Sequence, residues 1–214
     1  TAAIYGAFIP NPMHVYRTAG VLAGLGLSYG GATTEEDVVG LIFADQGIDL
    51  SKISGDIKIV SYLQGYGDTT TDEINAAIQA APEAFISVGM ATTFFTQQLN
   101  AAGIEFSDID SFTKSNGEAI TNGKLVYLAG KYSSSVGPAF ALVMNAINGN
   151  VIRDAQGNAV SLSQNYQVAT DSETFDKFYK NDNGDNPIYS RDTLDQIIGD
   201  TVTFDTINEV VESN

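Results

Sequence analysis

Short apolar runs alternate with helical patterns along the first 150 residues of this chain. The runs rich in β-forming residues predict strands at residues 2–9, 57–63, 84–88, 106–109 and 124–129. Apolar residues at helical spacing predict helices at residues 14–29, 37–44, 71–81, 92–102 and 136–147. Strands that alternate with helices form a parallel sheet, and right-handed crossovers cover both of its faces. The sequence therefore predicts an α/β fold with a doubly wound parallel sheet and helices on both faces.

The last third of the chain has a different pattern. A polar turn at residues 154–158 predicts a hairpin between 151–152 and 159–160, and short amphipathic helices are predicted at 172–179, 192–198 and 206–212. Residues 171–214 carry 11 acidic and three basic side chains, which is typical of a well-solvated segment. We therefore expect two parts, an α/β ligand-binding lobe at 1–150 and a hairpin with an acidic helical tail at 151–214. The tail is expected to pack on this lobe or on a further lobe missing from the sequence.

Composition excludes several classes of protein. The chain has 26 acidic against 10 basic residues and a net charge of −16, which argues against nucleic acid or an anionic membrane surface as a partner. It contains no cysteine and one histidine, so disulfides, a thiolate nucleophile and cysteine-based zinc sites are ruled out. A chain without cysteine that begins at Thr1 predicts an exported protein whose leader has been removed, or an excised piece of a longer protein. We expect an extracytoplasmic location.

Motifs for nucleotide cofactors and for nucleophilic catalysis are missing from the sequence. No phosphate loop is present, and Gly24 and Gly26 lack the third glycine of a dinucleotide fingerprint at its proper spacing. No G-x-S-x-G nucleophile elbow occurs, and His14 is the only histidine that could act as a base. The sequence therefore predicts no cofactor, no metal and no catalytic residue.

Polar and aromatic residues gather just after the predicted strands. Ligands of doubly wound sheets bind outside the carboxyl ends of the strands, so these residues are the candidate ligand contacts. They are Asn11, His14 and Arg17 after the first strand, Gln64 and Tyr66 after the second, Met90 after the third, Asp110 after the fourth, and Lys131 and Tyr132 after the fifth. Aromatic rings with amides and a few charged groups suit a neutral, hydroxylated ligand better than a phosphate. The alternative is that these loops are polar only because loops face solvent.

Arg17 is the most informative of these residues. The chain has three arginines, and this one lies at the start of a predicted helix, where its positive charge opposes the helix dipole. Its position therefore needs a compensating partner. A bound ligand would supply one, and so would a salt bridge to Asp110 or Asp68 without any ligand.

Several segments resemble the C-terminal lobe of type 1 periplasmic binding proteins, the two-lobed solute receptors of ABC importers. Gly6 followed by the stretch Arg17-Thr-Ala-Gly20 resembles the G…R-x-x-G opening of that lobe. Further resemblances occur in family order at residues 72–86, 101–110 and 125–141, and the tail at 165–179 is similar to receptors of the sugar and basic-membrane-lipoprotein branches.

The resemblance implies a flavodoxin-like lobe with a five-stranded parallel sheet in the order 2-1-3-4-5. It implies that Arg17 and Asp110 contact the ligand and that Lys131 or Tyr132 supplies a polar contact from the last strand. Val88-Gly89-Met90 stands where many sugar receptors carry Asn-Asp. The implied partners are a small solute such as a sugar or nucleoside, an ABC permease and an N-terminal lobe missing from this sequence. An apolar surface left without that lobe predicts self-association.

The sequence is also compatible with two other functions. The same fold serves as the effector-sensing domain of transcription regulators and chemoreceptors. A small α/β enzyme that uses His14 and Asp110 is the third possibility.

Overall fold

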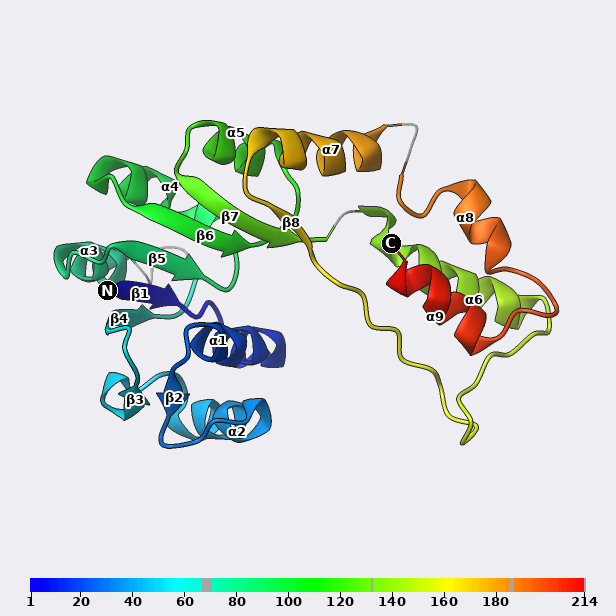
Figure 1. The fold of residues 1–214 in the computed structure, drawn as a ribbon, viewed down its shortest axis with the longest axis horizontal. Helices are drawn as coiled ribbons and strands as arrows, with labels where there is room; N and C mark the ends of the chain where they lie inside the picture. Colours follow the sequence, from blue (N-terminus) through cyan, green and yellow to red (C-terminus); the bar gives the residue numbers. More distant parts are fainter. Residues whose placement is uncertain (67–70, 132, 185–186, 214) are drawn as a thin grey trace. The chain divides into compact units, whose positions relative to one another are not determined.

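The computed structural model in Figure 1 describes residues 1–66, 71–131, 133–184 and 187–213. Its larger sheet has six strands in the order β4-β1-β5-β6-β7-β8. These strands are β1 (Ala2–Tyr5), β4 (Ile59–Leu63), β5 (Ala84–Ser87), β6 (Glu105–Ile109), β7 (Leu125–Gly130) and β8 (Gln167–Ala169). Neighbours from β4 to β7 pair in parallel. The predicted α/β class with a mainly parallel sheet is confirmed.

The predicted sheet of five strands in the order 2-1-3-4-5 is corrected to six. The five predicted strands correspond to β1, β4, β5, β6 and β7, and β8 adds a sixth strand beside β7. β8 was missed because it is three residues long and follows a long stretch without regular structure. The first strand also ends at Tyr5 and not at residue 9, because Ala7 adopts the left-handed conformation, which ends an extended strand.

Five helices accompany this sheet in the first part of the chain. They are α1 (Pro12–Gly24), α2 (Glu35–Asp45), α3 (Thr71–Gln79), α4 (Ala91–Ala102) and α5 (Lys114–Thr121). Asn11, Thr34 and Thr113 cap α1, α2 and α5 through their side-chain oxygens. Helix α5 was not predicted, because its sequence is polar and contains Gly117, so its helical spacing is weak.

Helices cover both faces of the sheet at β1. Ile4 packs into a core cluster with Val15 of α1 and Ile42 of α2. The ring of the next residue, Tyr5, meets the ring of Phe95 in α4 edge-on, with centroids 4.8 Å apart. Because successive strand residues point to opposite faces, α1 and α2 cover one face and α4 covers the other. Strand β1 is therefore buried on both sides, and all four of its residues are buried.

A second, two-stranded antiparallel sheet was not predicted. It pairs β2 (Ser28–Tyr29) with β3 (Ile53–Ser54), next to the one-turn helix η1 (Leu50–Lys52). The predicted helix at 14–29 therefore ends at Gly24, and Gly26 takes a positive φ that only glycine adopts readily.

Contacts divide the chain into two compact units. The first unit comprises Thr1–Ala129 with Ala169–Ser172, and the second comprises Gly130–Val168 with Glu173–Asn214. The boundary expected from the sequence, between residues 150 and 151, therefore differs from the observed one near Gly130. The physical reason is that the helix at the end of the predicted lobe shares a buried cluster with the tail.

The second unit is built around α6 (Gly137–Ile147), which follows the one-turn helix η3 (Ser133–Val136). Its other helices are α7 (Ser172–Asn183), α8 (Arg191–Gln196) and α9 (Phe204–Glu212). Ala141 of α6 packs with Ile197, Ile207 and Val211 in a buried cluster. The buried side chain of Asn145 adds two hydrogen bonds, one donated to the Ile197 carbonyl and one accepted from the Gly199 amide, both 2.8 Å long. The predicted hairpin forms a single antiparallel bridge, between Arg153 and Ala159.

Candidate functional site

The loops after β1 and β4 hold each other in place. The Gly65 amide donates to the Ala7 carbonyl at 2.6 Å, and the Tyr5 hydroxyl donates to the Gly65 carbonyl at 2.6 Å. Ala7 has a φ of 52°, and this backbone conformation costs free energy for any residue that has a side chain. These bonds bring Phe8 and Tyr66 together at the carboxyl end of the sheet, where their rings stack with centroids 5.5 Å apart.

His14 is buried in the first turn of α1, and the loop after β1 fixes its ring. The Phe8 amide donates a hydrogen bond to Nδ1 of His14 at 3.0 Å. The Phe8 carbonyl oxygen lies 3.1 Å from the same Nδ1, so Nδ1 accepts from the amide in one tautomer and donates to the carbonyl in the other. Burial lowers the pKa of His14, the nearby Phe8 carbonyl opposes that effect, and the charge of Arg17 lowers the pKa further. Burial thus disfavours the charged form of His14, and its Nε2 donates or accepts a hydrogen bond according to the tautomer.

We predict that His14 titrates below the ordinary value of 6.5. Stability that depends on its neutral form is fully present above pH 6.5 and is lost as the pH falls through this lower pKa. The chain has a single histidine, so its ring Cε1–H signal in a proton NMR titration reports this group alone. The same chain unfolded in urea serves as the control and should titrate near the ordinary value. A folded-state pKa at or above that of the unfolded chain contradicts the prediction.

Arg17 and His14 converge beside Gly89. The guanidinium Nη1 of Arg17 donates to the Val88 carbonyl at 2.9 Å. A Cβ placed on Gly89 would lie 3.5 Å from this Nη1 and 3.7 Å from Nε2 of His14. The same position is 3.4 Å from the carbonyl oxygen of Ile109, at the end of β6. The absence of a side chain at residue 89 therefore leaves room for a methyl-sized group next to the Arg17 guanidinium and Nε2 of His14.

Asp108 holds the backbone around Gly89 in place. Its buried carboxylate accepts hydrogen bonds from the Ser87 hydroxyl at 2.8 Å, the Ile109 amide at 2.9 Å and the Thr92 amide at 3.0 Å. The Ser87 hydroxyl oxygen in turn accepts from the Gly89 amide at 3.0 Å. Burial raises the pKa of Asp108, and the bonds from Thr92 and Ser87 act in the opposite direction. Asp108 thus joins the end of β5, the start of α4 and β6, and it holds Gly89 through Ser87.

An aromatic surface lies next to these donors. The ring of Tyr66 lies 5.7 Å from that of Phe94 in α4 and 6.2 Å from the imidazole of His14. Phe8 is 44% exposed and Tyr66 is 38% exposed, so part of the stack faces solvent. Rings of this kind bind apolar faces of ligands, while the neighbouring Arg17 guanidinium donates to oxygen atoms.

Five of the sequence-predicted site residues lie at this edge of the sheet. His14, Arg17 and Tyr66 come together, as described. Met90 follows Gly89 directly, is 36% exposed and has a φ of 68°, a second strained residue at this edge. Asp110 is partly buried two residues after Asp108, and its carboxylate accepts from the Ser111 amide at 2.7 Å.

Other predicted residues have different roles or lie elsewhere. Asn11 caps α1 by accepting from the Met13 amide at 3.1 Å. The side chain of Gln64 donates to the Gln46 carbonyl at 3.2 Å, so it faces the end of α2. Lys131 belongs to the second unit, where its ammonium lies 5.8 Å from the ring centroid of Tyr166. Tyr132 lies outside the described residues.

Sequence reasoning missed Asp108, Gly89, Phe8 and Phe94. The sequence did contain a signal for Asp108: an acidic residue within a predicted strand is rarely buried unless it has hydrogen-bond or charge partners. Gly89 carried no such signal, since a glycine between a strand and a helix has many ordinary uses. The role of Phe8 depends on the turn at Ala7, which the sequence does not predict.

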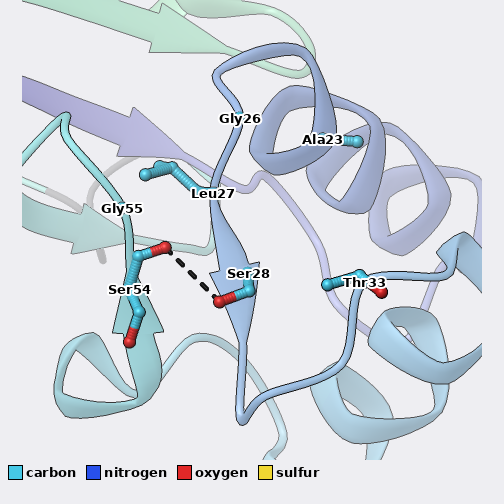
Figure 2. A pocket seen from close by; sticks show the side chains of 7 residues that line it. All are labelled: Ala23, Gly26, Leu27, Ser28, Thr33, Ser54 and Gly55. Atoms are coloured by element: carbon cyan, nitrogen blue, oxygen red, sulfur yellow. Dashed lines mark hydrogen bonds between the residues drawn. The ribbon is translucent and has the colours of Figure 1, made fainter.

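The hollow in Figure 2 lies away from this site. It has a volume of about 480 Å³ and is lined by residues from the end of α1, from β2 and from β3. Ser28 and Ser54, which face each other there, are joined by a hydrogen bond of 3.4 Å from the Ser28 hydroxyl to the Ser54 carbonyl. Ala23, on its wall, lies near the far end of α1, roughly 14 Å along the helix axis from His14. The hollow and the Gly89 space are therefore separate features.

Comparisons with known proteins assign no family. Neither a search against models of protein families nor a search of curated proteins finds a match to this chain. Among the described residues, no helix combines the length and the apolar character needed to span a membrane. Function must therefore be argued from the chemistry of the site.

Proposed function

We propose that this chain is one lobe of an extracytoplasmic solute-binding protein that delivers a small polar ligand to an ABC importer. The ligand binds at the carboxyl ends of β1, β4, β5 and β6. Binding without catalysis is the activity that the side chains there support best.

One observation carries the proposal: the Arg17 guanidinium and Nε2 of His14, both from α1, lie beside Gly89, whose missing side chain leaves room for a methyl-sized group. His14, held at Nδ1 by the Phe8 backbone, supplies Nε2 as a polar atom, and Arg17 supplies a permanent charge and N–H donors. Such donors pair with hydroxyl, carbonyl or carboxylate oxygens of a ligand. The aromatic stack of Phe8 and Tyr66 then covers an apolar face of that ligand. A sugar or a nucleoside has both features.

The role in transport rests on the resemblance to type 1 solute receptors. In that interpretation the first unit is a flavodoxin-like lobe, Arg17 and Asp110 are ligand contacts, and a second lobe closes over the ligand. A single lobe supplies only part of the contacts, so we expect the chain alone to bind with a Kd in the millimolar range, on the order of −4 kcal/mol.

The test is an NMR titration of the ¹⁵N-labelled chain with pentoses, hexoses, nucleosides and amino acids, each to about 10 mM. The amides of Phe8 and Gly89 are the reporters, because both donate hydrogen bonds inside the site. The Gly199 amide, which donates to Asn145 in the second unit, is the internal control. We expect at least one compound to shift the two reporters and leave Gly199 unchanged. If no compound moves the reporters, or if they move no more than Gly199, the proposal is wrong.

A further inference from the structure

Helix α6 has apolar residues on both of its sides. Its sequence, Gly137–Ile147, contains no charged residue. One side, with Pro138, Ala141 and Asn145, is buried in the second unit. A helix that is apolar all round is normally covered all round. The other side of α6 is exposed.

The exposed side forms a continuous line, which we call the α6 stripe. Val136, Phe140, Val143 and Ile147 follow one another at spacings of four, three and four residues, the spacing of a helix-packing seam. They are 67%, 49%, 57% and 71% exposed. Ala139 and Ala146 are exposed beside them. Large apolar side chains this exposed, in an unbroken line, mark an interaction surface.

An apolar groove adjoins the stripe within the same unit. It has a volume of about 250 Å³, and its walls include Val143 and Ala146 of α6 together with Val151 and Val160 of the following segment; Arg153 also lines it. An apolar cavity of about 150 Å³ is large enough to admit a benzene molecule, so this groove has room for a phenyl ring. The stripe supplies such a ring in Phe140.

We propose that the α6 stripe and its groove form a two-fold symmetric interface between two copies of this chain. A two-fold interface uses the same patch on both partners, so the patch must carry both the projecting side chains and the space that receives them. The stripe and the groove meet this condition on one surface. The four side chains of the stripe, with Ala139 and Ala146 beside them, present on the order of 500 Å² per copy, so a symmetric pair buries roughly 1,000 Å², the lower limit for a specific interface.

Charge favours a second copy over a charged partner. The stripe contains no ionisable group and the groove is lined by one charged residue, Arg153, although the chain has a net charge of −16. Two copies therefore repel each other through their negatively charged surfaces and attract each other through the α6 stripe and its groove. Salt screens the repulsion and leaves apolar contacts in place, so association must strengthen as ionic strength rises.

Sedimentation equilibrium of the full chain at low and high salt tests the proposal. We expect a reversible monomer–dimer equilibrium that shifts toward dimer at high salt. Val143→Glu places a charge at the middle of the stripe and on the groove wall, and it should raise the dimer Kd by at least about tenfold. Phe43→Glu is the matched control, because Phe43 is a 41% exposed residue of α2 in the first unit. A monomer under all conditions, or a dimer that Val143→Glu does not weaken, overturns the proposal.

A second variant keeps the test valid if Val143→Glu fails to fold. The chain has no cysteine, so Val143→Cys introduces a single thiol near the proposed two-fold axis. Under oxidation it should form a disulfide-linked dimer much faster than Glu36→Cys, whose thiol lies on the exposed surface of α2. Equal rates for the two variants contradict the interface.

Discussion

Replacing Asp108 with alanine is expected to lower the free energy of unfolding by about 3–5 kcal/mol. The carboxylate is fully buried and accepts bonds from the Ser87 hydroxyl and from the Thr92 and Ile109 amides. Alanine leaves these buried donors without an acceptor, and each unpaired donor costs about 1–3 kcal/mol. Urea unfolding followed by circular dichroism measures the loss.

Asp110→Ala is the matched control for this experiment. Asp110 lies two residues further along the chain, is partly exposed and accepts one bond, from the Ser111 amide. Its loss should cost about 1 kcal/mol or less. Equal costs for the two variants would mean that Asp108 does not join β5, β6 and α4 as described.

Replacing Arg17 with alanine is expected to weaken ligand binding by roughly 10- to 150-fold, which corresponds to about 1.5–3 kcal/mol for a hydrogen bond to a charged group. The guanidinium keeps its place through the Val88 carbonyl, and its Nη1 lies beside the open position at Gly89. The measurement is the Kd from the NMR titration, with the compound that shifts the Phe8 and Gly89 amides.

The control for Arg17→Ala is Arg191→Ala. Both variants remove one positive charge, but Arg191 is on α8 of the second unit and its side chain is 92% exposed. A general charge effect on the ligand would weaken binding equally in the two variants. Equal Kd values would therefore remove Arg17 from the site.

The alternation of strands and helices made the sheet predictable. β1, β4, β5 and β7 are mainly apolar runs bounded by turn residues, as buried strands of a parallel sheet require, whereas β6 has only Phe106 and Ile109 as apolar residues. β8 and α5 were not predictable in the same way. β8 is short and α5 is polar. β8 forms by pairing with another strand, and α5 is stabilised by the cap at Thr113.

The unit boundary shows a second limit of sequence patterns. The periodicity of α6 predicted a helix correctly, but periodicity does not say which core receives its buried side. Asn145 was informative, because a buried side-chain amide needs hydrogen-bond partners. Its partners are the Ile197 carbonyl and the Gly199 amide. Such pairings between distant residues are not visible in a single sequence.

The candidate site was predictable only in part. The rule that ligands bind at the carboxyl ends of strands led to His14, Arg17 and Tyr66, which the structure brings together. The rule gives no side-chain direction, so Gln64 was included although it faces the end of α2. It also favoured Asp110, after the strand, over Asp108 within it, whose bonds hold Gly89 in place through Ser87.

Substitution of Gly89 by alanine tests the central claim most directly, because the claim is that the open space beside Arg17 and His14 receives the ligand. An alanine Cβ would make ordinary contacts of 3.4–3.7 Å there, so the fold should persist while the space is filled. Gly20→Ala is the control, since a Cβ on that residue of α1 meets nothing within 4 Å. We predict that Gly89→Ala abolishes the ligand-induced NMR shifts and that Gly20→Ala preserves them. Unchanged binding by a folded Gly89→Ala variant would contradict the account.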